Sequence, residues 1–357
     1  MPEPTESIRV AVVGAGNIAG PYTENLTSYA ETDLVGIADL DPAKAKALAA
    51  KRDVTAYPDL DALLADDIDL VVNLSIHHAH YEVTKVCLEA GKPIYSEKPL
   101  AMRYEEAKEL VALAEHKGLR LGCSPFTFLG EAQQAAWQLV REERLGTVRV
   151  AYAEVNWGRI EAWHPAPAPF YEVGALFDVG VYPLTLLTAM FGPARRVSAQ
   201  GRILHPNRTG KTGEPFTVTT PDFVTATLDL EGGVVVRLTT NFYVTQRGKQ
   251  TGIELHGDAG SLHLSSWQNP DATLEFAEFG QAYEPVPLHN IPGIQWGRGV
   301  QEMAAAMLDG RPHRVTGEQA AHIVEILNAT TTSLETERPV EIGSSFPLPA
   351  PLGKTAP

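Results

Sequence analysis

The amino-acid sequence predicts an α/β protein of two domains, in which a parallel-sheet domain precedes an α+β domain with a largely antiparallel open sheet. Two observations carry this prediction. Up to Cys123, short apolar segments alternate with stretches of helical periodicity, and this alternation requires a parallel sheet with right-handed crossovers. After Cys123, longer segments that alternate polar and apolar residues are joined by glycine-containing turns, as in antiparallel hairpins. The length of 357 residues suffices for two hydrophobic cores.

The first strand, turn and helix have the pattern of a dinucleotide-binding unit. An apolar strand is expected at residues 8–13, and a glycine-rich turn and a helix follow it. Gly14 permits the tight turn, and Gly16 lets the backbone approach a pyrophosphate. The free N–H groups at Asn17 and Ile18 face the negative charge of that group. The sequence therefore predicts an N-terminal Rossmann domain that binds a nicotinamide dinucleotide.

The second strand, at residues 34–38, ends on Asp39. The Asp39 carboxylate can accept hydrogen bonds from both ribose hydroxyls and repels a 2′-phosphate, which favours NAD over NADP. A helix cap is the alternative role for this residue, but Asp41, which stands before a proline, fits the cap better. Lys44 and Lys46 nearby keep NADP possible.

The remaining elements of the first domain follow from the same alternation. We expect helices at 42–51, 81–90 and 104–117, and strands at 70–74, 94–96 and 119–123. Open parallel sheets bind ligands at the carboxyl ends of their strands, so the side chains found there are candidate cofactor ligands. These residues are Leu74, Ser75, His77 and His80 at one strand end, and Glu97 and Lys98 at another.

The histidines in this region suggest a metal site at first sight. His77, His78 and His80 lie within four residues, but no spaced carboxylate or cysteine completes a zinc site. Neutral imidazoles serve equally well as hydrogen-bond partners, so no metal is expected. Cys87 and Cys123 have neither Cys-x-x-Cys nor histidine spacing, and we expect both to be reduced core residues.

The second domain is expected to contain a helix, long strands and a final helix. The expected elements are a helix at about 130–144, a strand at 148–157, hairpins at 223–243 and 253–265, and a last helix at about 318–334 that packs back on the body. The predicted domains are residues 1–125 and 126–343. A proline-rich tail at 344–357 is expected to be loosely held.

Composition argues against two classes of partner. The net charge is −15 and no basic run occurs, which argues against nucleic acid. The N-terminal segment is acidic and lacks an apolar signal region, and we find no apolar run of about 18 residues. We therefore expect a soluble, cytoplasmic protein without a membrane partner.

Four motifs resemble the Gfo/Idh/MocA family of nicotinamide-dependent oxidoreductases, named after glucose–fructose oxidoreductase, inositol dehydrogenase and a rhizopine catabolism protein. The resemblance covers almost the whole chain. It rests on the turn at 14–19, on Leu88-Glu89-Ala90-Gly91-Lys92 leading to Glu97-Lys98-Pro99-Leu100, on 174–182, and on Thr316-Gly317-Glu318-Gln319-Ala320. The resemblance implies that Lys98, Asp178 and Tyr182 meet at the nicotinamide.

Hydride transfer needs such a set of side chains. When a secondary alcohol is oxidised, hydride leaves carbon for the nicotinamide, the hydroxyl proton goes to a base, and negative charge develops on oxygen. The Lys98 cation would stabilise that charge. The same cation would stabilise a phenolate at Tyr182, so that the tyrosine can relay the proton. Structural alternatives remain open. Asp178 could cap a helix, Tyr182 could be a core residue, and Lys98 could be a solvated lysine.

An aromatic, proline-broken segment before the third motif is the candidate substrate wall. Trp163 and His164 would offer flat faces to a polyol or pyranose, with core packing or a subunit contact as alternatives. Phe126, at the join of the domains, is expected to bind substrate as well. Two of the chain's departures from the family pattern lie at the third motif. Val173 stands where many relatives have glycine, and Tyr182 replaces the histidine of inositol-type members, as in the sugar and dihydrodiol enzymes.

These observations leave three functional hypotheses. The first is an NAD-dependent dehydrogenase that acts on a hydroxyl of a sugar, cyclitol or glycoside. The second is redox-assisted glycoside cleavage, or hydride exchange between two sugars, with tightly held cofactor. The third is a non-catalytic NAD-sensing regulatory protein, against which the intact Lys98, Asp178 and Tyr182 argue. The alternating strands leave one face of the second sheet for another subunit, so we expect a homodimer or homotetramer.

Overall fold

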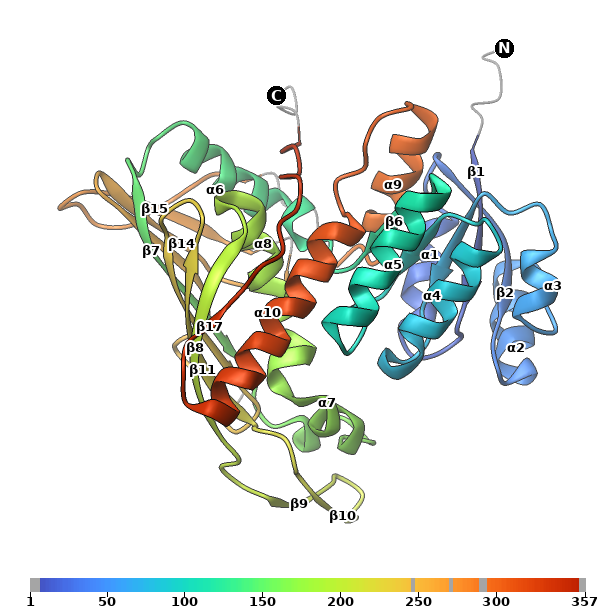
Figure 1. The fold of residues 1–357 in the computed structure, drawn as a ribbon, viewed down its shortest axis with the longest axis horizontal. Coiled ribbons are helices and arrows are strands. Elements are labelled where there is room, and N and C mark those ends of the chain that lie inside the picture. The colour runs from blue at the N-terminus through green and yellow to red at the C-terminus, as the bar shows by residue number, and fades with distance from the viewer. Residues whose placement is uncertain (1–6, 245–247, 270–271, 289–293, 353–357) are drawn as a thin grey trace. The chain divides into compact units, whose positions relative to one another are not determined.

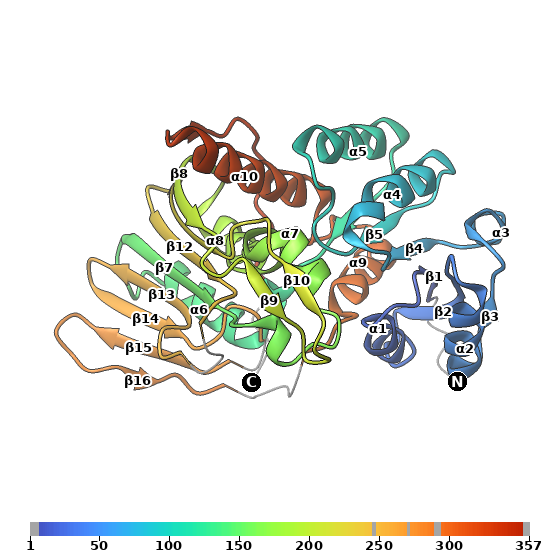
Figure 2. The same cartoon turned by 90° about the horizontal axis from the view of Figure 1, so that it is seen from below.

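The computed structural model describes residues 7–244, 248–269, 272–288 and 294–352. The chain forms two compact units, which Figures 1 and 2 show in two views. The first unit contains residues 1–126 and 294–324, and the second contains 127–293 and 325–357. The predicted boundary at residue 125 therefore lies next to the observed one at residue 126, but the chain returns to the first unit at residue 294.

The first unit is built on a six-stranded parallel sheet with the order β3-β2-β1-β4-β5-β6. Its strands are β1 (Ile8–Val13), β2 (Thr32–Ala38), β3 (Thr55–Ala56), β4 (Leu70–Asn73), β5 (Ile94–Ser96) and β6 (Leu121–Cys123). This order is that of a doubly wound dinucleotide fold, and it places the change in winding direction between β1 and β4. All four residues of β4 are buried, because helices cover both faces of a parallel sheet. The predicted fold class is confirmed.

Helices pack on the two faces of this sheet. They are α1 (Ala19–Leu26), α2 (Pro42–Arg52), α3 (Leu60–Leu64), α4 (His80–Glu89), α5 (Tyr104–Lys117) and α9 (Arg298–Leu308). Helix α4 packs against α5 on one face, and α1 packs against α2 and α9 on the other (Figure 2). Asp41 caps α2 as predicted, because its carboxylate accepts a hydrogen bond from the Ala43 N–H at 3.0 Å.

The return of residues 294–324 corrects the predicted domain boundaries. The Arg120 guanidinium, just before β6, donates hydrogen bonds to the carbonyl oxygens of Arg311 at 2.7 Å and Ala306 at 3.2 Å. At Gly317 a Cβ atom would lie 2.5 Å from Leu121 Cγ, so only glycine permits this close approach. These contacts join segments almost 200 residues apart, and local sequence pattern carries no signal for them.

The second unit is built on a nine-stranded sheet with the order β16-β15-β14-β13-β7-β12-β11-β8-β17. Its strands are β7 (Val148–Asn156), β8 (Ala194–Arg202), β11 (Phe223–Leu230), β12 (Val235–Asn241), β13 (Gly252–Gly257), β14 (Gly260–Leu264), β15 (Leu274–Glu278), β16 (Glu284–Pro285) and β17 (Val340–Glu341). All neighbouring pairs are antiparallel except β7 and β12, which are parallel. Both predicted hairpins are present, as β11–β12 and β13–β14.

Helices cover one face of this sheet (Figure 1). They include α6 (Glu131–Arg141), α7 (Ala168–Val179), α8 (Val181–Phe191) and the second half of α10 (Gly317–Thr336). Along β11 every second residue is buried, in keeping with one packed and one open face. Short helices η1 (His77–Ala79), η2 (Thr127–Leu129) and η3 (Ile160–Ala162), and the strand pair β9 (Asn207–Thr209) and β10 (Pro215–Thr217), complete the described elements.

Two findings in the second unit bear on expectations from the sequence, one on an apolar helical segment and one on the tail. The segment Ala168–Phe191, with 24 residues, is long and apolar enough to cross a membrane, but 78% of its most apolar window is buried in the protein. A helix that is apolar on every side is also what a buried core position requires. The tail is docked rather than loose as far as residue 352. Phe346 is buried, and the Leu352 N–H donates to Gln134 Oε1 at 2.9 Å. Residues 353–357 lie outside the described part.

Candidate functional site

The glycine turn after β1 has the geometry that a pyrophosphate needs. Gly14 has φ +102°, and a Cβ atom there would lie 2.5 Å from the Leu74 carbonyl oxygen, so the position admits only glycine. At Gly16 a Cβ atom would have no neighbouring atom within 4 Å, so its backbone faces open space. Within the described part of the chain, no group accepts a hydrogen bond from the N–H of Asn17 or Ile18. These donors at the start of α1 fit an anion.

Asp39 has a structural role that the sequence does not reveal. Its Oδ2 accepts a hydrogen bond from the Ala15 N–H at 2.6 Å, and its Oδ1 accepts one from the Asp41 N–H at 2.7 Å. The carboxylate therefore ties the glycine turn to the end of β2. Each oxygen keeps a further lone pair, so Asp39 can still accept hydrogen bonds from ribose hydroxyls.

Two apolar side chains follow the strands on either side of β1 and add to the fit for a dinucleotide. Leu40, after β2, is fully exposed, and Ile76, after β4, is 69% exposed. Exposed aliphatic groups beside an anion site suit the flat faces of an adenine ring. Lys44 and Lys46 are exposed on α2. The residues present therefore fit NAD, which the phosphate turn, the acid and the apolar pair would hold.

The backbone of the loop after β4 is fixed by its own side chains. The Leu74 N–H donates to the Val13 carbonyl oxygen at 2.7 Å, and the Leu74 side chain is buried, so only its backbone could meet a cofactor. The Ser75 N–H and hydroxyl both donate to Asn73 Oδ1, at 3.1 and 2.6 Å. His77 opens η1. No group of metal ligands occurs among the residues that the structure describes.

His80 differs from its predicted role as a cofactor ligand. Its side chain is buried, with Nδ1 2.7 Å from the Pro99 carbonyl oxygen and Nε2 3.0 Å from the Ser75 carbonyl oxygen. Burial lowers the pKa of His80, although both hydrogen bonds and the Glu97 charge oppose the shift. Because both ring nitrogens contact the backbone, His80 links the loop after β4 to the segment that carries Lys98.

Glu97 also makes its hydrogen bonds within the protein. Its Oε1 accepts a hydrogen bond from the Tyr22 hydroxyl at 2.5 Å, and its Oε2 accepts one from the Lys98 N–H at 3.0 Å. The Ser124 hydroxyl lies 3.1 Å from the Tyr22 hydroxyl and 3.0 Å from that of Tyr95. Burial, with the Glu97 charge adding to it, raises the pKa of Tyr22, so that this hydroxyl stays a donor. The network fixes the backbone at Lys98, which directly follows β5, and it argues against the predicted contact of Glu97 with the cofactor.

In the second unit, Asp178 and Tyr182 lie one helical turn apart. Asp178 is in the last turn of α7 and Tyr182 in the first turn of α8, and Gly180 between them keeps right-handed helical angles, φ −64° and ψ −26°. The two side chains therefore share a helix face. No side chain caps α8, whose N-cap is Gly180, so Asp178 is not the helix cap that the sequence left open. Gly174, with φ +82°, makes the kink in α7 next to Val173.

An aromatic row connects Tyr182 to the predicted substrate wall. We define the row as Tyr182, Trp267, Trp157 and Trp163, with ring centroids 5.4, 5.5 and 6.1 Å apart in that order. Trp163 also contacts the His164 ring at 5.4 Å and is 37% exposed, whereas Trp267 is buried. The sequence does not predict Trp267, because it lies in a separate loop far along the chain. A lone tryptophan in a serine-containing turn is the only available signal.

Phe126 does not support its predicted role in substrate binding. Its side chain is 3% exposed, and its Cβ lies within 3.0 Å of the position of a Cβ on Gly299, at the start of α9. Phe126 is therefore a core residue of the first unit. Lys98 belongs to the first unit and the Asp178–Tyr182 pair to the second, so the meeting of these three residues at a nicotinamide stays a prediction.

Comparisons with known proteins agree with this description. Residues 8–124 match the Gfo/Idh/MocA model described as an oxidoreductase family with an NAD-binding Rossmann fold, and residues 133–263 match the Gfo/Idh/MocA C-terminal domain. A trans-1,2-dihydrobenzene-1,2-diol dehydrogenase from Sus scrofa is 31% identical over 203 residues, which are 55% of this chain and 60% of the relative. The chain thus matches about three fifths of the length of this curated relative.

Solved structures share the fold over nearly the whole chain. An oxidoreductase domain protein from Kribbella flavida superposes with a TM-score of 0.84 at 22% identity, covering 95% of this chain and 100% of that one. A levoglucosan dehydrogenase in complex with NADH and L-sorbose superposes with a TM-score of 0.83 at 19% identity, covering 95% and 99%. One of the two family models matches within each unit. The chain belongs to the Gfo/Idh/MocA family of oxidoreductases, and its first unit is an NAD-binding Rossmann domain.

Proposed function

We propose that the protein is an NAD-dependent dehydrogenase that transfers hydride between the nicotinamide and a secondary hydroxyl of a sugar, cyclitol or related ring diol. The observation that carries the proposal is the aromatic row, which extends from Tyr182, the candidate proton carrier, to the exposed Trp163. Flat aromatic faces bind the apolar face of a sugar ring, and polar groups at one end of such a wall orient its hydroxyls.

Each candidate residue has a role that follows from its chemistry. NAD, when bound, accepts the hydride. The Lys98 ammonium stabilises the negative charge that develops on the substrate oxygen, and the Tyr182 hydroxyl relays the proton. Asp178, on the same helix face as Tyr182, orients the hydroxyl that reacts or its neighbour. Asp39 would accept hydrogen bonds from the adenosine ribose, which favours NAD over NADP.

The names of similar proteins support the substrate class. By its name, the pig relative acts on trans-1,2-dihydrobenzene-1,2-diol, and the levoglucosan dehydrogenase binds L-sorbose in its solved complex. Both molecules carry neighbouring hydroxyls on a small carbon skeleton. A ring with one apolar face and neighbouring hydroxyls is the shape that an aromatic row of this kind accommodates.

Formation of NADH in a substrate panel tests the proposal. We would incubate the protein with NAD and either levoglucosan, D-glucose, myo-inositol or trans-1,2-dihydrobenzene-1,2-diol, and record the absorbance of NADH. We expect turnover with at least one compound. In the Lys98→Met variant, turnover should fall by at least about a hundredfold while the affinity for NADH is kept. Lys108→Met, at an exposed position on α5, serves as the control.

Three other outcomes of these measurements would change the proposal. Absence of NADH with every compound contradicts a dehydrogenase with free cofactor exchange. Cofactor that co-purifies and never accumulates as NADH favours hydride exchange within one catalytic cycle. Unchanged turnover of the Lys98→Met variant would remove the lysine from the mechanism.

We also propose that the protein is a cytoplasmic homo-oligomer that assembles through the open face of the nine-stranded sheet. On this face the Arg237 guanidinium lies 4.2 Å from the Tyr152 ring centroid and 2.7 Å from Glu154 Oε1. The His256 ring stands 5.3 Å from that of Tyr152. An aromatic and charged patch of this composition is suited to a subunit interface.

A further inference from the structure

Between β8 and β11 the chain leaves the sheet as an arm, which we define as residues 203–221 and which contains β9 and β10. Most of the arm is exposed, but the side chain of Arg208, in the middle of β9, has no exposed surface. A buried arginine in a mostly exposed segment requires an explanation, because a buried charge is costly unless it is fully paired.

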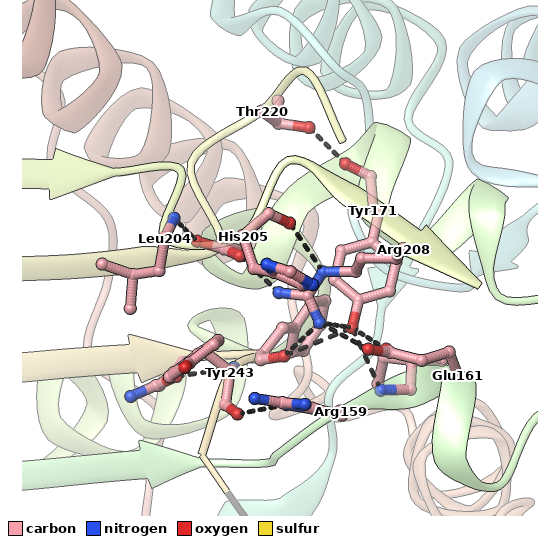
Figure 3. A network of polar contacts seen from close by, with 12 residues as sticks. Arg159, Glu161, Tyr171, Leu204, His205, Arg208, Thr220 and Tyr243 are labelled. Carbon is pink, nitrogen blue, oxygen red and sulfur yellow. Dashed lines mark hydrogen bonds and ion pairs between the residues drawn. The ribbon is translucent and has the colours of Figure 1, made fainter. Parts of the chain in front are cut away.

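Arg208 is paired with two carboxylates from different segments (Figure 3). Its Nη1 donates to Glu161 Oε1 at 2.7 Å, and its Nη2 donates to Asp222 Oδ2 at 2.5 Å. Nη1 also donates to the Tyr171 hydroxyl at 2.8 Å, and Nε donates to the His205 carbonyl oxygen at 3.1 Å. Burial opposes the charge of Arg208, but the hydrogen bond to Glu161 and the neighbouring charges raise its pKa, so it stays a cation.

Through two of these partners, Glu161 and Tyr171, Arg208 holds the aromatic loop, which we define as residues 157–170. Glu161 lies in η3, within this loop, and the Tyr171 hydroxyl donates to the Glu161 carboxylate. The Tyr171 hydroxyl also accepts a hydrogen bond from the Ile160 N–H at 3.2 Å. The turn at η3 is thus attached to Arg208 through both a charge and a hydroxyl.

Trp163 and His164 leave directly from this anchored turn. Their N–H groups donate to the Ile160 carbonyl oxygen, at 3.1 Å from Trp163 and 2.9 Å from His164. On the other side of η3, the Arg159 Nε donates to the Tyr243 carbonyl oxygen at 2.9 Å, a contact that Figure 3 also shows. Arg208 therefore holds the buried side of the turn from which Trp163, the exposed end of the aromatic row, leaves.

We propose that Arg208 is a positioning residue, which holds the aromatic loop in the conformation that presents Trp163 to the substrate. The role of the loop in substrate binding rests on the proposed function. Buried ion pairs add little net stability, so we attribute this network to the fixed local conformation that it gives the loop. The planar, forked guanidinium fits this set of acceptors, which an ammonium group cannot engage together.

Two variants test the proposal, because removal of the buried cation alone could unfold the unit. Tyr171→Phe removes only the hydroxyl, and its ring keeps the contacts with Phe216 and Phe242 at 5.4 and 5.6 Å. Arg208→Lys keeps the charge but loses the fork. The matched control is Arg149→Lys, in an exposed pair with Asp258 in the same unit.

Amide hydrogen exchange and steady-state kinetics are the two readouts. In both test variants, peptides from 157–170 should exchange faster, while the rest of the second unit should keep its protection. With levoglucosan or trans-1,2-dihydrobenzene-1,2-diol, whichever the wild type oxidises faster, KM should rise by about tenfold or more while kcat changes less. The affinity for NADH should stay unchanged, and Arg149→Lys should match the wild type in every measurement.

Each outcome separates this inference from the proposed function. Unchanged exchange of 157–170, or an unchanged KM, overturns the inference. Faster exchange throughout the unit, with a weakened affinity for NADH, means a general loss of structure and also overturns it. If the wild type oxidises neither compound, the substrate assignment fails by itself, and the exchange of 157–170 alone then decides whether Arg208 holds the loop.

Discussion

At the scale of single residues, three polar side chains of the first unit, Asp39, His80 and Glu97, make their hydrogen bonds within the protein. Lys98 is a candidate because of its place at a strand end, and Tyr182 because of the family resemblance, and the part that each plays in catalysis stays a prediction. The sequence predicts Glu97, His80 and Asp39 as cofactor ligands, but their described contacts are with the protein itself. A pattern of residue types cannot distinguish a side chain that meets a ligand from one that fixes its neighbour, because both are polar and lie at strand ends.

Tyr22 tests the positioning of Lys98. Tyr22→Phe removes the hydroxyl that donates to Glu97 Oε1 at 2.5 Å, and leaves a buried carboxylate oxygen without that donor. We expect the free energy of unfolding to fall by about 1–3 kcal/mol and kcat to fall by about tenfold. Tyr57→Phe is the control, because the Tyr57 hydroxyl donates to Asp66, outside the hydrogen-bond network of Glu97. Equal kcat values in the two variants would exclude a special role for Tyr22.

His80 and His313 predict how stability depends on pH. Burial lowers the pKa of both groups below their ordinary value. The unfolded chain then binds protons more readily than the folded protein as pH falls through the ordinary histidine pKa of about 6.5. The stabilisation is complete above that pH and is lost as pH falls toward the lowered pKa of the folded state. Urea unfolding between about pH 5 and 7.5 should show this loss. A His80→Gln, His313→Gln variant with the same slope would contradict the assignment.

At the scale of elements, the parallel half of the fold was predictable because each of its elements has a local signal. Apolar strands, helical periodicity and Asp41 as a cap are all visible within about ten residues. The two-residue strand β3 and the strand β8, with its charged sequence, gave no such signal. Strand β8 is defined by its pairing with β11, which is a contact between distant segments.

The glycine turn allows folding and cofactor binding to be separated. At Gly14 the positive φ and the nearby Leu74 carbonyl exclude a side chain, so Gly14→Ala should lower the free energy of unfolding by about 1–3 kcal/mol. At Gly16 a Cβ atom would meet no protein atom within 4 Å, so Gly16→Ala should leave stability unchanged and weaken NADH binding, since its methyl group would occupy the cofactor's space. Thermal unfolding and NADH fluorescence titration measure the two effects. Equal stability of the two variants would mean that the turn relaxes around the new methyl group.

At the scale of the whole molecule, the division of the chain was only partly predictable. The change from alternating helices and strands to long hairpins marks the boundary near residue 126. The return of residues 294–324 to the first unit depends on contacts such as those of Arg120, and local pattern alone assigns this segment to the nearer domain. The same reasoning explains why the sequence does not reveal Trp267, since its neighbours come from two other segments of the second unit.

The open face of the nine-stranded sheet carries the last prediction. Arg237 pairs with Glu154 on the neighbouring strand and lies over the Tyr152 ring, so the Arg237→Glu variant places like charges side by side on this face. If the face joins subunits, light scattering should show an oligomer for the wild type and a smaller species for the variant, because the same repulsion acts on both copies. Arg103→Glu, in an exposed pair of the first unit, should leave the mass unchanged. A wild-type protein with the mass of one chain would refute the interface, and an unchanged mass of the Arg237→Glu variant would place it elsewhere on the surface.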